Sequence, residues 1–193
     1  MKEIVVKYSE GEEFKRELPE PGLHGAVYSH VFDLGEQEQS WQGEAWMSHK
    51  VLVYWELDQT LTEGKWAGDR MLIHKEYTMS LSEKSNLRAD LESKRGRQYT
   101  AEDLQKFKDN GMHLEKLRGI PCQLNVKIKT SRAGKEYPVV DIVLPPTEEG
   151  KDMLPNLAED WEPPKWVKEK IEKGFGATGS ANKPEIFDDD VPF

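Results

Sequence analysis

The sequence has only one cysteine, Cys122, and no uncharged apolar run of the about 18 residues that span a membrane. A single cysteine excludes an internal disulfide and any zinc cluster built on thiolates. Its place in the alternating run Pro121 to Ile128 predicts a buried thiol. The first residues, MKEIVVKYSEGEEFKRE, also lack the apolar segment of a signal peptide. We therefore expect a soluble cytoplasmic protein without membrane contact.

Clusters of chemically reactive residues are missing as well. The five histidines are scattered without the paired spacing of metal ligands. Carboxylates are plentiful, but they form no recognisable acid–base pair or two-metal set, and the chain has no glycine-rich phosphate loop or nucleophile motif. These absences favour a protein that is not an enzyme and that needs neither a metal nor a cofactor.

What the sequence does have is charge, and the charge is segregated along the chain. Over 193 residues the net charge is −9. Arg70 to Tyr137 nevertheless carries 15 Lys and Arg against 9 Asp and Glu, and the remainder carries 12 against 27. A basic middle between acidic ends is compatible with nucleic-acid binding, because the local charge matters more than the sum.

Five segments have the residue pattern of β-strands. They are residues 26–34, 50–57, 71–81, 122–130 and 137–146. A long polar loop around Trp41 to His49 is expected between the first two, and a turn at Ser131 to Lys135 joins the last two as a hairpin. Trp55 and Tyr77 share the alternating faces of apolar neighbours, so both are expected in the core.

Helices are predicted after the third strand and near the end of the chain. Ser85 is placed to cap a first helix that Gly96 ends, and Thr100 with Asp103 forms the capping box of a second. The segment from Trp166 to Ile171 has a short apolar stripe flanked by lysines. A helix this short is marginal alone. We expect it to pack on its own barrel, with pairing to a second subunit as the alternative.

Five strands with helix between the third and the fourth follow the order of an OB-fold, a small barrel that commonly binds oligonucleotides. We predict an all-β fold with added helices, in which an OB-like five-stranded barrel is closed or nearly closed. The expected divisions are an N-terminal arm (1–25), the OB-like domain (26–146), a linker with a short amphipathic helix (147–173) and a flexible acidic tail (174–193).

The tail carries the most specific motif of the chain. It consists of Asp188, Asp189, Asp190, Val191, Pro192 and Phe193. A solubilising role explains the aspartates but not Val-Pro-Phe, because an aromatic ring in a disordered tail has nothing of its own to pack against. A basic pocket with an apolar slot in a partner protein would recognise both features. The motif therefore predicts a partner-docking segment.

These residues carry a resemblance to known proteins. The ending resembles the acidic, Pro-Phe-terminated tip of bacterial single-stranded-DNA-binding proteins, which docks replication and repair enzymes. The stretch YTMSLSEKSNLRADLESKRGRQYTAEDL, followed by LRGIPCQLNV, resembles a family of phage-encoded single-stranded-DNA-binding proteins with an OB-fold core. KVLVYWEL and PPKWVKEKI are similar to the corresponding family segments. The resemblance covers most of residues 26 to 173.

Single-strand binders need cations along the phosphates and flat rings on which bases stack. The basic middle of the chain supplies the cations, and rings outside the expected core supply the stacking surfaces. The candidates for contact with DNA are Trp41, Trp46, Tyr54, Trp66, Lys75, Arg88, Arg95, Arg97, Lys127, Lys129, Arg132, Lys135 and Tyr137. Because OB-folds bind through strands two and three and through loops one-two and four-five, the loop around Trp41 and the turn at Arg132 are the expected rims.

The sequence therefore predicts a protein that binds single-stranded DNA without sequence preference in phage replication or recombination, in the cytoplasm of the infected cell. Its tail would recruit replication and recombination proteins, and a homodimer is open. Two alternatives remain. One is an OB-like adaptor that binds protein and not DNA, and the other is a nucleic-acid-processing enzyme such as a nuclease.

Overall fold

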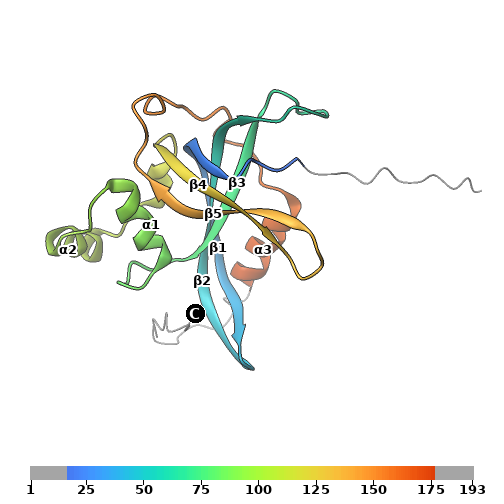
Figure 1. Cartoon of the computed structure of the whole chain (residues 1–193). Coiled ribbons are helices and arrows are strands. Elements are labelled where there is room, and N and C mark those ends of the chain that lie inside the picture. Colours follow the sequence, from blue (N-terminus) through green and yellow to red (C-terminus); the bar gives the residue numbers. More distant parts are fainter. Residues whose placement is uncertain (1–16, 177–193) are drawn as a thin grey trace, which may run out of the picture.

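A computed structural model describes residues 17–176, which form five antiparallel strands, three α-helices and one 3₁₀ helix (Figure 1). The elements are β1 (Gly22–Trp41), β2 (Glu44–Thr60), β3 (Arg70–Thr78), α1 (Asn86–Arg95), α2 (Ala101–Asn110), η1 (Leu114–Leu117), β4 (Pro121–Thr130), β5 (Glu136–Leu144) and α3 (Lys165–Gly176). The strands form one sheet in the order β3-β2-β1-β4-β5. The prediction of a β-rich fold with helices between the third and fourth strands is confirmed.

The sheet is not closed into a barrel, so the expectation of a closed or nearly closed barrel is wrong. Within the described residues β3 and β5 are its two edges, with no strand pairing between them. Helix α1 contacts both of these edge strands. Its Asp90 accepts hydrogen bonds from Lys75 and Tyr77 of β3, each at 2.7 Å. Side chains of α1 therefore cover the opening between the two edge strands, where backbone hydrogen bonds would have to form to close a barrel.

The main core fills the side of the sheet that faces α1. Trp55 and Tyr77 are buried there, as expected, together with Leu87 and Leu91 from α1. The predicted helix ends at Gly96 and Thr100 are confirmed, because Gly96 adopts a left-handed conformation (φ 74°) after α1 and Thr100 makes the capping box of α2. Ser85 does precede α1, but the predicted cap is wrong, because its hydroxyl donates to the carbonyl of Ser80 and makes no capping bond to the helix. The alternation of β4 also places Cys122 in this core.

Helix α3 covers the opposite side of the sheet (Figure 1). Val167 is fully buried against Leu34 and Leu52, which confirms that this helix docks on its own sheet. Gly174 sits so close to the backbone of Leu34 that a side chain there would collide with it. None of the described helices, α3 included, has the length and apolar character to cross a membrane.

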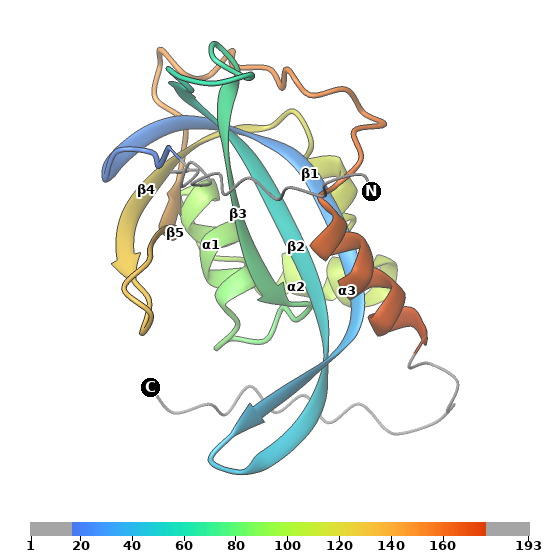
Figure 2. The ribbon, with the colours of Figure 1, turned by 90° about the vertical axis from the view of Figure 1, so that its right-hand side faces the viewer.

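Strands β1 and β2 are much longer than predicted. In place of a loop around Trp41 to His49, they continue as a hairpin that turns at Gln42 and Gly43, whose φ angles of 48° and 89° are both positive. We call residues 36–49 the finger, and Figure 2 shows it extending past the end of α3. At the other end, residues 22–25 belong to β1 and pair with β4, so this strand begins four residues before the predicted start of the OB-like domain.

Candidate nucleic-acid interface

The β4–β5 hairpin brings several predicted DNA contacts together. Alternation turns Lys127 and Lys129 to the exposed side of β4, while Val126 points into the core. Tyr137 of β5 lies directly opposite Lys129 and is 43% exposed. The connecting turn is held by hydrogen bonds between Ser131 and Lys135 and exposes Arg132 at its tip. One hairpin therefore carries four cations, and Tyr137 lies directly opposite one of them.

Three of these cations are free to meet a ligand. Lys129, Arg132 and Lys135 are exposed and form no ion pair within residues 17–176. Lys127 differs, because its Nζ atom lies 2.8 Å from Oδ2 of Asp141 on β5. The hydrogen bond from Lys127 lowers the pKa of Asp141, so this carboxylate is charged at neutral pH and partly neutralises the lysine. We refer to Lys129, Arg132, Lys135 and Tyr137 as the basic hairpin.

The finger carries the second pair of predicted rings. Trp41 pairs across the hairpin with Glu44, and Gln39 pairs with Trp46, so the two indoles lie on the same face as diagonal neighbours. Trp41 is 47% exposed, and Trp46 is partly exposed. Indole side chains exposed to water on a projecting two-stranded hairpin are unusual, because large apolar surfaces are normally buried. It suits stacking against a flat ligand.

Two other predicted rings are placed elsewhere. Tyr54 is only 5% exposed, because Trp161 packs edge-on against it with ring centres 5.5 Å apart. The expectation that Tyr54 is open for stacking is therefore wrong. Trp66 is exposed, with Lys65 over its ring, but it lies in the turn after β2, at the opposite end of that strand from the finger.

The predicted cations near α1 are largely engaged with other residues. Lys75 binds Asp90 at 2.7 Å, Arg88 binds Glu92 at 2.9 Å, and Arg95 binds Asp103 at 2.8 Å. The hydrogen bond from Arg95 is the main reason that the pKa of Asp103 falls to about 2. Arg97 alone among the predicted cations near α1 is exposed without an ion pair to a described residue. The Lys75–Asp90 pair joins β3 to α1 and the Arg95–Asp103 pair joins α1 to α2, whereas the Arg88–Glu92 pair lies within α1.

Sequence reasoning missed the residues that modify this surface. Asp141, which neutralises Lys127, has no motif around it. Trp161, which covers Tyr54, lies in a stretch rich in acidic residues and proline that gives no periodic signal. The only sequence hint was the tryptophan itself, because an indole in a polar linker needs something to pack against.

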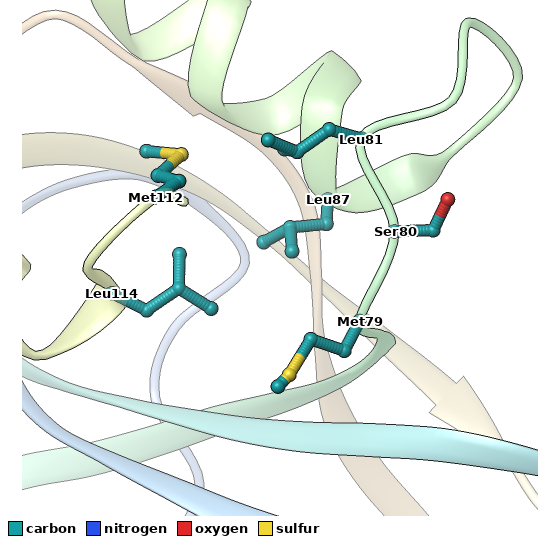
Figure 3. Close-up of a pocket in the computed structure, with 6 residues that line it drawn as sticks. All are labelled: Met79, Ser80, Leu81, Leu87, Met112 and Leu114. Carbon is teal, nitrogen blue, oxygen red and sulfur yellow. The ribbon is translucent and has the colours of Figure 1, made fainter. Parts of the chain in front are cut away.

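A separate hollow of about 160 Å³ lies between the end of β3, α1 and η1 (Figure 3). It is lined by Met79, Ser80, Leu81, Leu87, Met112 and Leu114. Figure 3 shows the apolar side chains around the space and the Ser80 hydroxyl pointing away from it. Such a lining offers no charge to a phosphate and no acid or base for catalysis.

Across residues 17–176, no group of histidine, cysteine or carboxylate side chains is arranged to hold a metal ion. The predicted docking segment, Asp188 to Phe193, lies outside the described residues. A scan against models of known protein families found no match, and a search of curated proteins found no significant match either. The evidence for a function therefore comes from the surface of this chain.

Proposed function

We propose that this protein binds single-stranded DNA without sequence preference, through the basic hairpin and the finger. The observation that carries the proposal is that Lys129, Arg132 and Lys135, which form no ion pair within residues 17–176, belong to the same hairpin as the exposed ring of Tyr137. When such cations neutralise phosphates, the counterions held by the nucleic acid are released, which favours binding. Each base stacked on an aromatic ring adds about 1 to 3 kcal/mol to the binding free energy. Neither interaction reads a base sequence.

The strand topology supports an OB-like assignment. In the described sheet β1 pairs with both β2 and β4, and the helices come between the third and fourth strands. An OB-fold is a partly open five-stranded Greek-key barrel, and it uses the connections between strands one and two and strands four and five to hold oligonucleotides. In this chain those two connections are the finger and the basic hairpin.

The proposed mechanism is electrostatic capture without chemistry. The phosphates would lie along the cations, and the bases would stack on Tyr137, Trp41 and Trp46. The bound strand would thereby be protected and kept from pairing with a complementary strand. In line with the resemblance to phage proteins, we place this activity in replication or recombination within the infected cell, with Asp188 to Phe193 as the segment that recruits partner proteins. We propose no catalytic step.

The test is a titration with labelled oligothymidylate, followed by fluorescence anisotropy at several salt concentrations. We expect the variant Lys129→Glu/Arg132→Glu/Lys135→Glu to lose most of its affinity. The matched control, Lys108→Glu/Lys116→Glu/Lys173→Glu, reverses the same number of exposed positive charges away from the hairpin and keeps its affinity. Three phosphate contacts give a slope of log affinity against log salt of about −2 for the hairpin alone.

Three outcomes overturn the proposal. Failure of the unmodified chain to bind oligothymidylate would favour the protein-binding adaptor. Equal losses in the two triple variants would mean that only net charge matters and that the hairpin is not the site. Divalent-metal-dependent loss of the labelled DNA would point to a nuclease.

A further inference from the structure

A row of aromatic rings crosses the sheet on the side that α3 covers. His30, Tyr54 and His74 are direct cross-strand partners on β1, β2 and β3. The ring centres of Tyr54 and His74 are 5.1 Å apart, and Phe32 flanks the row, stacked 5.8 Å from His30. Neighbouring strands are about 4.8 Å apart, so such a row runs perpendicular to the strands. It is a platform of flat surfaces on the strands that OB-folds use for oligonucleotides.

The row is occupied by the chain itself. Residues 145–164, which we call the strap, connect β5 to α3 without forming a helix or a strand. The strap places Trp161 over the row, with its ring centre 5.2 Å from that of His30 and 5.5 Å from that of Tyr54. One indole, tilted by 49° against His30 and by 69° against Tyr54, therefore covers the rings against which a base could otherwise pack.

The strap is held mainly through its backbone, and most of its contacts suit a nucleic-acid backbone equally well. Arg70 donates to the carbonyl of Leu154 at 2.6 Å, and Arg118 donates to that of Leu157 at 2.8 Å. His30 Nε2 lies 3.0 Å from the carbonyl oxygen of Ala158. These groups donate to a phosphate oxygen as readily as to a carbonyl oxygen.

Glu56 binds the strap through contacts that a phosphate cannot replace, and it also accepts from Ser29 and lies 3.7 Å from Arg70. Its buried carboxylate accepts hydrogen bonds from the backbone N–H groups of Asn156 and Leu157, at 2.8 and 3.0 Å. A phosphate in the same place would be repelled by this charge. The strap is therefore favoured while no strand is bound, and α3 remains fixed behind it through Val167 and Gly174.

We infer that the strap is an intramolecular competitor for single-stranded DNA, in which Trp161 stands in for a base on the row of His30, Tyr54 and His74. The inference rests on the proposed function. A strand long enough to extend from the basic hairpin to the row displaces the strap, while α3 stays in place. A short strand binds the hairpin alone and leaves the strap closed.

The first measurement uses the unmodified full-length chain and backbone hydrogen exchange. The amides of Asn156 and Leu157 are protected by Glu56 in the free protein. With an oligothymidylate of about 16 nucleotides, the upper end of the range for one OB-fold, we expect their exchange to speed up, and with one of about 4 nucleotides we expect no change. Continued protection in the complex with the long strand overturns the inference.

The second measurement removes the competitor. Trp161→Ala is expected to bind the longer strand about tenfold more tightly, the scale of one stacked ring, and the shorter strand as before. Leu154→Ala is the matched control, because this strap side chain is 69% exposed and its loss leaves the indole in place. Unchanged or weaker binding by a folded Trp161→Ala variant overturns the inference, and if that variant does not fold, the exchange measurement decides. Failure of the unmodified chain to bind either strand contradicts the proposed function instead.

Discussion

Lys127 on β4 and Asp141 on β5 are joined across the hairpin by a salt bridge of 2.8 Å, beside three cations that have no such partner among residues 17–176. While this salt bridge is intact, the charge of Lys127 is not available to a phosphate. Asp141→Asn removes the carboxylate and keeps the shape, so we expect single-stranded DNA to bind several-fold more tightly. Because one more cation then meets a phosphate, the salt slope should steepen by about 0.7. Anisotropy titrations at several salt concentrations measure both effects.

The control for this change is Glu102→Gln, which breaks the 2.8 Å pair with Lys106 on α2 and changes the net charge by the same amount. We expect it to leave the salt slope unaltered. An equal gain in affinity from both substitutions would show that only overall charge matters and that the Lys127–Asp141 pair has no special part in binding.

Gly174→Ala is expected to loosen α3 from the sheet. The added methyl would collide with the carbonyl of Leu34 and the side-chain amide of Gln37. Forcing extra volume into a packed contact typically costs about 1 to 3 kcal/mol. Gly176→Ala, two residues on, meets open space and should be close to neutral. Urea denaturation of the two variants provides the comparison, and equal stabilities would show that this close approach is not a constraint.

Cys122 should be unreactive in the folded protein. Burial raises the pKa of this thiol to about 12, and only 1% of the residue is exposed. At pH 8 a disulfide reagent should therefore modify the chain only as fast as it opens, and completely once it is unfolded in denaturant. Rapid stoichiometric labelling under native conditions would contradict the packing of β4 against the core.

The link between α1 and α2 should weaken in acid. The pKa of Asp103 in the folded chain is about 2, below the value near 3.9 of an unfolded aspartate, because it accepts from Arg95 and from the backbone of Thr100. Its stabilising effect is therefore complete above about pH 4 and is lost as the pH falls towards 2. Asp103→Asn should be less stable than the unmodified chain at pH 6, and the difference should shrink between pH 4 and pH 2. A difference that stays constant in acid would contradict this assignment.

Phe193→Ala tests the recruiting segment separately from DNA binding. The substitution keeps Asp188, Asp189 and Asp190, so DNA affinity should hardly move. Capture of replication and recombination proteins should fall, because the ring that fills an apolar slot is gone. Pull-downs with the two proteins at matched concentrations measure this, and equal recovery of partners would remove the recruiting role.

Local chemistry was enough to predict the helices and the hairpin that carries the cations. A cap at Thr100, a left-handed glycine at Gly96 and the alternation of β4 are all properties of neighbouring residues. The finger was missed because neither of its faces is fully buried, so its strands have no apolar alternation and look like a polar loop.

The burial of Tyr54 under the strap could not have been predicted in the same way. Alternation indicates that Tyr54 and Trp55 point to opposite sides of β2, but not which side meets solvent. That depends on the strap, whose course is set by Glu56 and Arg118, far away in sequence. The pairing of Lys75 with Asp90 is likewise a product of the tertiary fold, which the sequence around either residue does not indicate.

The central position of β1 has a consequence for how the chain acquires its structure. This strand pairs with β2, which follows it directly in the sequence. Its first residues pair instead with the distant strand β4, since Gly22 lies opposite Val126. Helix α3, later still, then covers Leu34. The β1–β2–β3 meander precedes both of the helices that cover its two faces and the strand that pairs with the start of β1. Long-range pairings of this kind slow folding in general, and a sheet that still lacks its partners exposes edges and apolar faces on which chains aggregate.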